Sequence, residues 1–142
     1  MLGLLPLAPL GVAADDTVVS VCTEQALDQA LEQAQTNGGR TITITCNGVI
    51  PFNTHKEITA SVKIVGVGTV AFDGQGITRL FWVHPDATLE LERLALQNGA
   101  SSSNGGAIFN DHGTLKITAS AFSGNNATNQ GGAIYFYGEH SG

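Results

Sequence analysis

The sequence predicts an all-β protein: a right-handed parallel β-helix of about four rungs, with a short α-helix capping its N-terminal end. The first observation behind this prediction is an internal repeat, because residues 88–110 align without a gap on residues 114–136. The second is the alternation of apolar and polar side chains within each repeat, which is typical of short strands. The third is composition: Gly accounts for 18 of 142 residues and charged residues for only 13%, which favours short strands joined by tight turns.

Composition and charge also exclude several classes of protein. The chain has 12 acidic residues against 6 Lys and Arg, a net charge of −6, so nucleic acid is not an expected partner. No apolar run reaches the roughly 18 residues that a membrane-spanning helix needs, so we expect no integral membrane segment in the mature chain. With 42% hydrophobic residues the chain can build a core, which excludes a disordered, charge-rich protein.

The N-terminal segment indicates export. Residues 1–14 carry no charge and contain a short apolar stretch that ends in Val12-Ala13-Ala14, small residues that suit a signal-peptidase site. We therefore expect residues 1–14 to be a signal peptide and the protein to be secreted or displayed on the cell surface. A positively charged start is missing, so an ordinary apolar arm is the alternative interpretation.

Residues 15–40 form the predicted N-terminal segment with its capping helix. Helical spacing of apolar side chains is seen at Ala26, Leu27, Ala30, Leu31 and Ala34. Thr23 can serve as the N-cap, and Asn37-Gly38-Gly39 provides the left-handed residues that end a helix. We expect this helix to lie across the open N-terminal end and to cover the edge of the first rung.

The two cysteines, Cys22 and Cys46, match neither a zinc-binding pattern nor a CxxC redox motif. With a signal peptide ahead of them, a Cys22–Cys46 disulfide is the favoured interpretation. It would join the start of the helix to the end of the first strand and stabilise the fold by about 3 kcal/mol. Two unpaired, buried thiols are the alternative.

Residues 41–142 are predicted to form the rungs. A strand at residues 41–46 follows the helix, and residues 62–64 and 81–83 belong to a weaker copy of the repeat, in which Val62 takes the place of Leu89. Alternation predicts one set of inward-facing apolar side chains, with Leu91 directly over Ile117. This set comprises Leu89, Leu91, Ile108, Leu115, Ile117 and Ile134. The strand at residues 133–137 has no following rung, so we expect the stack to be truncated at its C-terminal end and to self-associate end to end.

Two motifs resemble those of known proteins. Gly105-Gly106-Ala107-Ile108 and Gly131-Gly132-Ala133-Ile134, with Phe122-Ser123-Gly124-Asn125, are similar to the GGA[I/L/V] and FxxN repeats of chlamydial polymorphic outer membrane proteins. They also resemble the repeats of secreted bacterial β-helix proteins with the pectin-lyase-like fold. The resemblance covers residues 22–137, with Leu96-Gln97-Asn98-Gly99 in place of one FxxN motif. It implies an exported, surface-associated or adhesive protein and names no ligand.

A polysaccharide lyase or hydrolase would need a cluster of carboxylates, with a base for lyase chemistry. The best available constellation is a corner of Asp86, Asp111 and His112, which a spacing near one repeat would stack on adjacent rungs. A solvated polar turn is the favoured interpretation of this corner, and calcium binding is an alternative that no calcium-loop motif supports. Asp73, before Gly74, is interpreted as a turn residue. No catalytic residue or metal ligand is therefore assigned, and no cofactor is expected.

Two surface features offer further alternatives. Trp82 could stack on a carbohydrate ring, but its alignment with Ile108 and Ile134 favours a core position. One face of the first strand carries Thr41, Thr43 and Thr45. An ice-binding surface would require such an array on every rung, yet it does not persist, and high β-propensity accounts for it. His55 and His140 are expected in surface loops.

These observations predict a structural or adhesive protein that acts through the outer faces of its sheets. Its expected partner is a carbohydrate or another ligand on a host or cell surface. The alternative is the N-terminal part of a polysaccharide lyase or glycoside hydrolase, with catalytic rungs beyond Gly142. The residues present favour the non-enzymatic interpretation because they contain no catalytic constellation.

Overall fold

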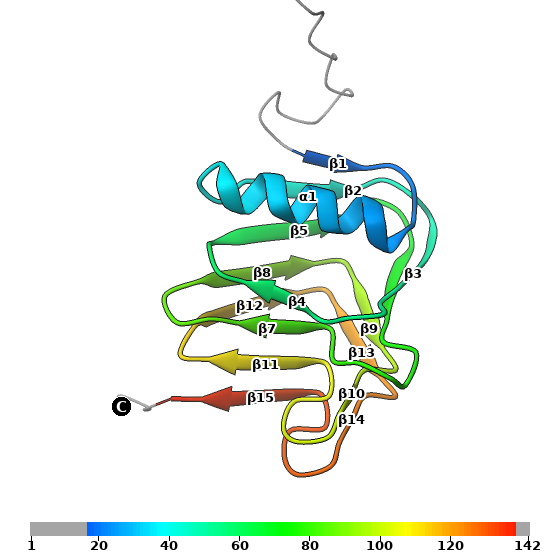
Figure 1. Cartoon of the computed structure of the whole chain (residues 1–142). Helices are drawn as coiled ribbons and strands as arrows, with labels where there is room; N and C mark the ends of the chain where they lie inside the picture. The colour runs from blue at the N-terminus through cyan, green and yellow to red at the C-terminus, as the bar shows by residue number, and fades with distance from the viewer. Residues whose placement is uncertain (1–16, 139–142) are drawn as a thin grey trace, which may run out of the picture.

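The computed structural model describes residues 17–138, which form parallel β-sheets and one short helix (Figure 1). This agrees with the predicted all-β architecture of parallel strands. The predicted signal peptide at residues 1–14 and His140 lie outside the described residues. Within residues 17–138, no helix has the length and apolar character needed to cross a membrane.

The first sheet contains five parallel strands in the order β1-β2-β5-β8-β12. They are β1 (Thr17–Val19), β2 (Thr41–Ile44), β5 (Val62–Gly66), β8 (Thr88–Glu92) and β12 (Thr114–Thr118). Val62 lies opposite Leu89, and Leu89 lies opposite Leu115, which confirms the predicted alignment of the repeats in this sheet.

Two further sheets contain four parallel strands each. The second comprises β3 (Gly48–Pro51), β6 (Val70–Asp73), β9 (Ala95–Gln97) and β13 (Ala121–Ser123). The third comprises β4 (Lys56–Ile58), β7 (Phe81–Val83), β11 (Ile108–Asp111) and β15 (Ile134–Tyr137). A short parallel pair, β10 (Ala100–Ser101) and β14 (Asn126–Ala127), lies in the connections between the second and third sheets. From β2 onward the chain visits the three sheets in turn and completes this course four times.

The core consists of apolar side chains stacked from strand to strand. In the first sheet Ile42 lies opposite Ile64, Ile64 opposite Leu91, and Leu91 opposite Ile117, as predicted for the last pair. The first three of these side chains are fully buried, and Ile117 on the edge strand β12 is half-buried. The predicted inward set is otherwise fully buried at Leu89 and Ile108, while Leu115 and Ile134 are half-buried and pack against the core. Like residues therefore cover like residues, and each strand shields the one before it.

The glycine doublets have a steric explanation. Gly105 adopts a left-handed conformation, with φ of 70°. A Cβ atom on Gly106 would collide with the backbone carbonyl of Gly132, the second glycine of the next doublet. Glycine at position 105 thus permits the left-handed turn, and glycine at position 106 permits successive chain passes to approach closely.

The helix α1 (Glu24–Thr36) forms where the sequence predicts it. Thr23 is its N-cap and accepts a hydrogen bond from the backbone N–H of Ala26 at 3.2 Å. Its buried side chains are Leu27, Ala30, Leu31 and Ala34. The helix packs beside β1, β2 and β5 (Figure 1). We expected the helix to cover the edge of the first rung, and for β2 this was wrong. The edge of β2 is instead hydrogen-bonded to β1, a strand that the repeat pattern does not reveal.

Covalent and ionic contacts fix the start of the helix to the first pass of the chain. Cys22 and Cys46 form the predicted disulfide, with a Cα–Cα distance of 5.7 Å. Glu24 accepts hydrogen bonds from Lys56 Nζ at 2.6 Å and from the backbone N–H of Asn53 at 2.8 Å. Lys56 is only 5% exposed, so this ion pair satisfies a charge that would otherwise be costly to bury.

Candidate functional site

The outer face of the third sheet carries a ladder of aromatic side chains. Trp82 on β7 lies opposite Phe109 on β11, which lies opposite Tyr135 on β15. The ring centroids are 5.0 Å apart in the first pair and 5.5 Å apart in the second. All three side chains are half-buried, whereas their strand neighbours Phe81 and Ile108 are fully buried. The three rings therefore face away from the core and form a row of contacting aromatic side chains, here called the aromatic ladder.

The predicted core position of Trp82 is wrong, and the register explains why. Between β7 and β11 the structure pairs Phe81, and not Trp82, with Ile108, so the repeat alignment is displaced here by a single position. Because side chains alternate between the two faces of a strand, such a displacement moves a side chain to the opposite face. Phe81 fills the core position instead and contacts Phe72 at a centroid distance of 5.8 Å.

Two histidines flank Trp82. The rings of His55 and His84 each lie 5.9 Å from the indole, centroid to centroid. His84 Nε2 is 3.1 Å from Oε1 of Glu57. His55 is half-buried, and this burial lowers the pKa of its imidazole. The neutral form of the ring is therefore favoured over the protonated form more strongly than it would be for a histidine in water.

Arg79 links the aromatic ladder to the neighbouring loop. Its guanidinium carbon lies 5.4 Å from the ring centroid of Trp82 and 5.2 Å from that of Phe109. Nε donates to the carbonyl of Gly105, and Nη2 donates to the carbonyl of Asn104 and to Oγ of Ser101. In the described part of the chain Nη1 makes no hydrogen bond and Arg79 has no carboxylate partner. Burial lowers the pKa of Arg79.

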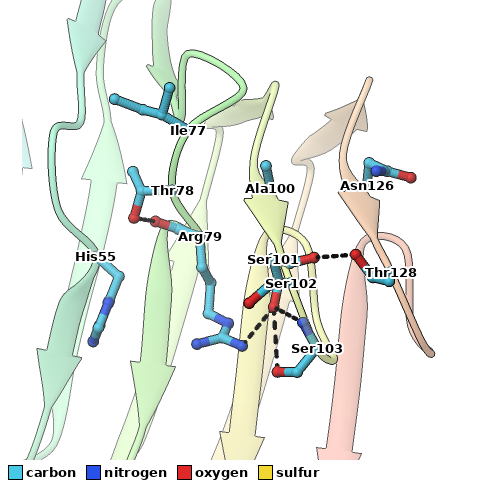
Figure 2. A pocket seen from close by; sticks show the side chains of 10 residues that line it. All are labelled: His55, Ile77, Thr78, Arg79, Ala100, Ser101, Ser102, Ser103, Asn126 and Thr128. Carbon is cyan, nitrogen blue, oxygen red and sulfur yellow. Dashed lines mark hydrogen bonds between the residues drawn. The ribbon is translucent and has the colours of Figure 1, made fainter.

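A groove of about 480 Å³ opens beside Arg79 (Figure 2). It runs along the connections between the second and third sheets, and each of the four chain passes contributes to it. Hydroxyl groups line much of it, from Thr78, Ser101, Ser102, Ser103 and Thr128. His55 and Arg79 are the ionisable residues among its described lining, which includes no Asp or Glu. The groove thus combines neutral hydrogen-bonding groups with a cation.

The predicted polar corner is only partly assembled. Asp111 Oδ1 lies 2.6 Å from His112 Nδ1, and the His112 ring meets Tyr137 edge-on at 5.1 Å. Asp86 is exposed and makes no hydrogen bond or ion pair within residues 17–138. The described residues contain no group of three or more His, Cys, Asp or Glu suited to a metal ion. The structure therefore brings together Asp111 and His112, which are neighbours in sequence, without joining Asp86 to them.

Two other sequence features have structural explanations. Asp73 accepts hydrogen bonds from the backbone N–H of Gln75 at 2.7 Å and from the side chains of Gln97 and Asn98, in keeping with a turn role. Thr43 is only 8% exposed and lies between Val18 and Val65 on the adjacent strands. The threonine face is therefore neither open nor continued on later strands.

Comparison with known proteins gives no match: no family model fits the chain, and no curated protein and no solved structure is significantly similar to it. Function is therefore inferred from the aromatic ladder, Arg79 and the groove. Sequence reasoning missed Arg79 and the groove. The hydrophilic run Ser101-Ser102-Ser103-Asn104 marks a loop, but no pattern shows that Arg79 packs against it.

Proposed function

We propose that this chain is an extracytoplasmic segment of a right-handed parallel β-helix whose role is adhesive, through carbohydrate binding on the outer face of the third sheet. Three parallel sheets visited in turn, with Val62, Leu89 and Leu115 in register, support the helical course. Right-handedness follows from the strong preference for right-handed crossovers between parallel strands. The glycine doublets and their resemblance to adhesive repeat proteins support the same assignment.

Secretion or display on the cell surface is supported by the disulfide. Disulfides form and persist in oxidising compartments and are rare in the cytosol. Cys22 and Cys46 are bonded, and no free cysteine remains. The predicted signal peptide at residues 1–14 is in keeping with this route, although it lies outside the described residues.

The aromatic ladder is the observation that carries the proposal. Aromatic side chains normally contribute to a core, whereas Trp82, Phe109 and Tyr135 face outward at spacings of 5.0 and 5.5 Å. A flat apolar ring can cover the C–H face of a sugar, and polar groups beside it can bond the sugar hydroxyls. The groove supplies such groups from Thr78 and Ser101. Successive rings then suit successive sugar units of an extended chain.

Replacement of Trp82 tests this proposal. Trp82→Leu keeps apolar bulk against the sheet but removes the aromatic face. Val49→Ala is the control, because Val49 is 48% exposed and lies on β3 in the second sheet. We expect a glycan array to reveal binding by the wild-type chain, and calorimetry to show at least a roughly tenfold weaker affinity for Trp82→Leu but less than about a twofold change for Val49→Ala.

Two outcomes would contradict the proposal. One is a wild-type chain that binds no saccharide on the array. The other is a folded Trp82→Leu variant, with an unchanged circular dichroism spectrum, that binds as tightly as the wild type. In that second case the aromatic ladder would serve only to stabilise the sheet through cross-strand pairs.

A further inference from the structure

We propose that Arg79 and the groove beside it form a subsite for an anionic group, a carboxylate or a sulfate, on the saccharide bound by the aromatic ladder. This inference rests on the proposed function and names the chemical class of its ligand: an acidic saccharide. The whole chain is acidic, with 12 Asp and Glu against 6 Lys and Arg.

Arg79 differs from Lys56, Lys63 and Arg93 in having no carboxylate partner within the described residues, and from the exposed Lys116 in being half-buried. Lys56 pairs with Glu24 and Asp28, and Lys63 pairs with Glu90 and Glu92. Arg93 pairs with Glu92. Since acidic residues are in excess, the lack of one at a half-buried guanidinium leaves a positive site that an external anion can neutralise.

The guanidinium of Arg79 is also held in place before any ligand binds. Nε and Nη2 are fixed by the carbonyls of Gly105 and Asn104 and by Oγ of Ser101, at 2.6 to 2.9 Å. The rings of Trp82 and Phe109 lie against it. Nη1 keeps its two N–H donors for a ligand, so an oxyanion can bind at a small cost in side-chain entropy.

Hydroxyl groups beside Arg79 complete the subsite. Figure 2 shows the guanidinium directed toward Ser101, whose Oγ also accepts a hydrogen bond from the backbone N–H of Ser103. The hydroxyls of Ser103 and Ser101 are 3.5 Å apart. The described lining of the groove contains no Asp or Glu, so no carboxylate within it competes with an incoming anion for Arg79. Hydrogen bonds from the guanidinium or from these hydroxyls to an ionised oxygen are charge-assisted, and such bonds are stronger than those between neutral groups.

Three hexasaccharides of one backbone test the inference: chondroitin sulfate, desulfated chondroitin, and desulfated chondroitin with its carboxylates reduced to alcohols. For the wild-type chain we expect calorimetry to show at least tenfold tighter binding of one or both acidic forms than of the neutral form. Comparison of chondroitin sulfate with desulfated chondroitin separates recognition of the sulfate from recognition of the carboxylate. Added salt should weaken binding of the acidic forms selectively.

Arg79→Gln should remove the advantage of the acidic forms, so that acidic and neutral forms bind with affinities within about twofold of each other, while Arg79→Lys should retain part of that advantage. Arg93→Gln is the matched control, because Arg93 also donates through Nε to a backbone carbonyl, that of Gly66, but lies away from the groove. It should leave all three affinities unchanged.

The outcomes separate this inference from the proposed function. Equal binding of acidic and neutral forms by the wild type, or equal weakening of both by Arg79→Gln, overturns the inference and leaves carbohydrate binding intact; Arg79 would then only fasten the loop at residues 104–105. Wild-type binding of none of the three, together with an empty glycan array, contradicts both. If Arg79→Gln does not fold, the wild-type comparison of acidic with neutral forms decides the question.

Discussion

At the residue scale, hydrogen bonds hold two partly buried carboxylates in their ionised form. Burial alone would raise the pKa of Glu24, but the hydrogen bonds from Lys56 and from two backbone N–H groups outweigh it and lower the pKa. The pKa of Asp73 is lowered in the same way, because hydrogen bonds from two side-chain amides and a backbone N–H outweigh the effect of burial. Both groups couple proton binding to folding.

This coupling predicts that acid destabilises the fold. Since each folded-state pKa lies below the ordinary value of 4.5 for Glu24 or 3.8 for Asp73, the stabilisation is fully present above those values and is lost as the pH falls through the folded-state pKa. Urea unfolding measured from neutral pH downward should show this loss, and Glu24→Gln and Asp73→Asn should each reduce it. Asp86→Asn is the control, because the exposed Asp86 makes no hydrogen bond in the described residues. Identical pH profiles for all three variants and the wild type would exclude this assignment.

At the scale of the elements, ladders of buried side chains between parallel strands form most of the apolar core. Leu91 on β8 is fully buried between Ile64 and Ile117, whereas Lys116 on β12 is exposed. Leu91→Ala should lower the free energy of unfolding by about 2–5 kcal/mol, because it removes buried methyl groups and leaves a cavity. Lys116→Ala should lower it by about 0.5 kcal/mol or less. Similar losses from both variants, measured by urea unfolding, would contradict the assigned alternation.

The disulfide should act on the N-terminal elements most strongly. Replacing Cys22 and Cys46 together by Ser should cost about 3 kcal/mol, since the bond joins positions with a sequence separation of 24. Hydrogen exchange should accelerate most in α1 and β2 and least in β11 and β12. Uniform acceleration across the sheets would argue instead that the whole stack unfolds as one unit.

The elements also show what the sequence could and could not predict. The repeat and its alternation predict the strands and most of their inward faces, because stacking in register requires like residues at a constant offset. The strand β1 escapes this reasoning because it has no counterpart in the repeat. The repeat alignment places Trp82 on the wrong face because the chain inserts one extra residue between β7 and β11, and a change of a single position reverses the face.

At the scale of the whole molecule, stacking builds a groove that no single repeat contains. Its lining comes from four successive chain passes, from His55 to Thr128. Sequence patterns predict strands from local alternation, but loops have no such period, so the contact of Arg79 with Ser101 and Gly105 emerges only from packing. The sequence therefore predicts an adhesive role, but it does not predict that the outer face of the third sheet is the binding face that we propose.

The stack also presents open strand edges. β12, β13 and β15 are each the edge of their sheet in the described part of the chain, and Phe136 on β15 is 50% exposed. We expect the isolated chain to self-associate at micromolar concentration in sedimentation experiments, because unpaired edges with apolar side chains favour pairing. Phe136→Lys should shift the chain toward monomer. Val67→Lys is the control and should not, because Val67 is 63% exposed but lies away from β15. A wild-type monomer with slow amide exchange in β15 would contradict this expectation.

The most direct test of the saccharide-binding face uses Trp82 itself, because it is the only tryptophan in the chain. Its emission reports on the first ring of the aromatic ladder without any label or substitution. Titration with a saccharide identified on the glycan array should produce a saturable shift or quenching, with the same dissociation constant as calorimetry. If that saccharide binds by calorimetry while the emission of Trp82 stays unchanged through saturation, binding takes place elsewhere and the proposed face is wrong.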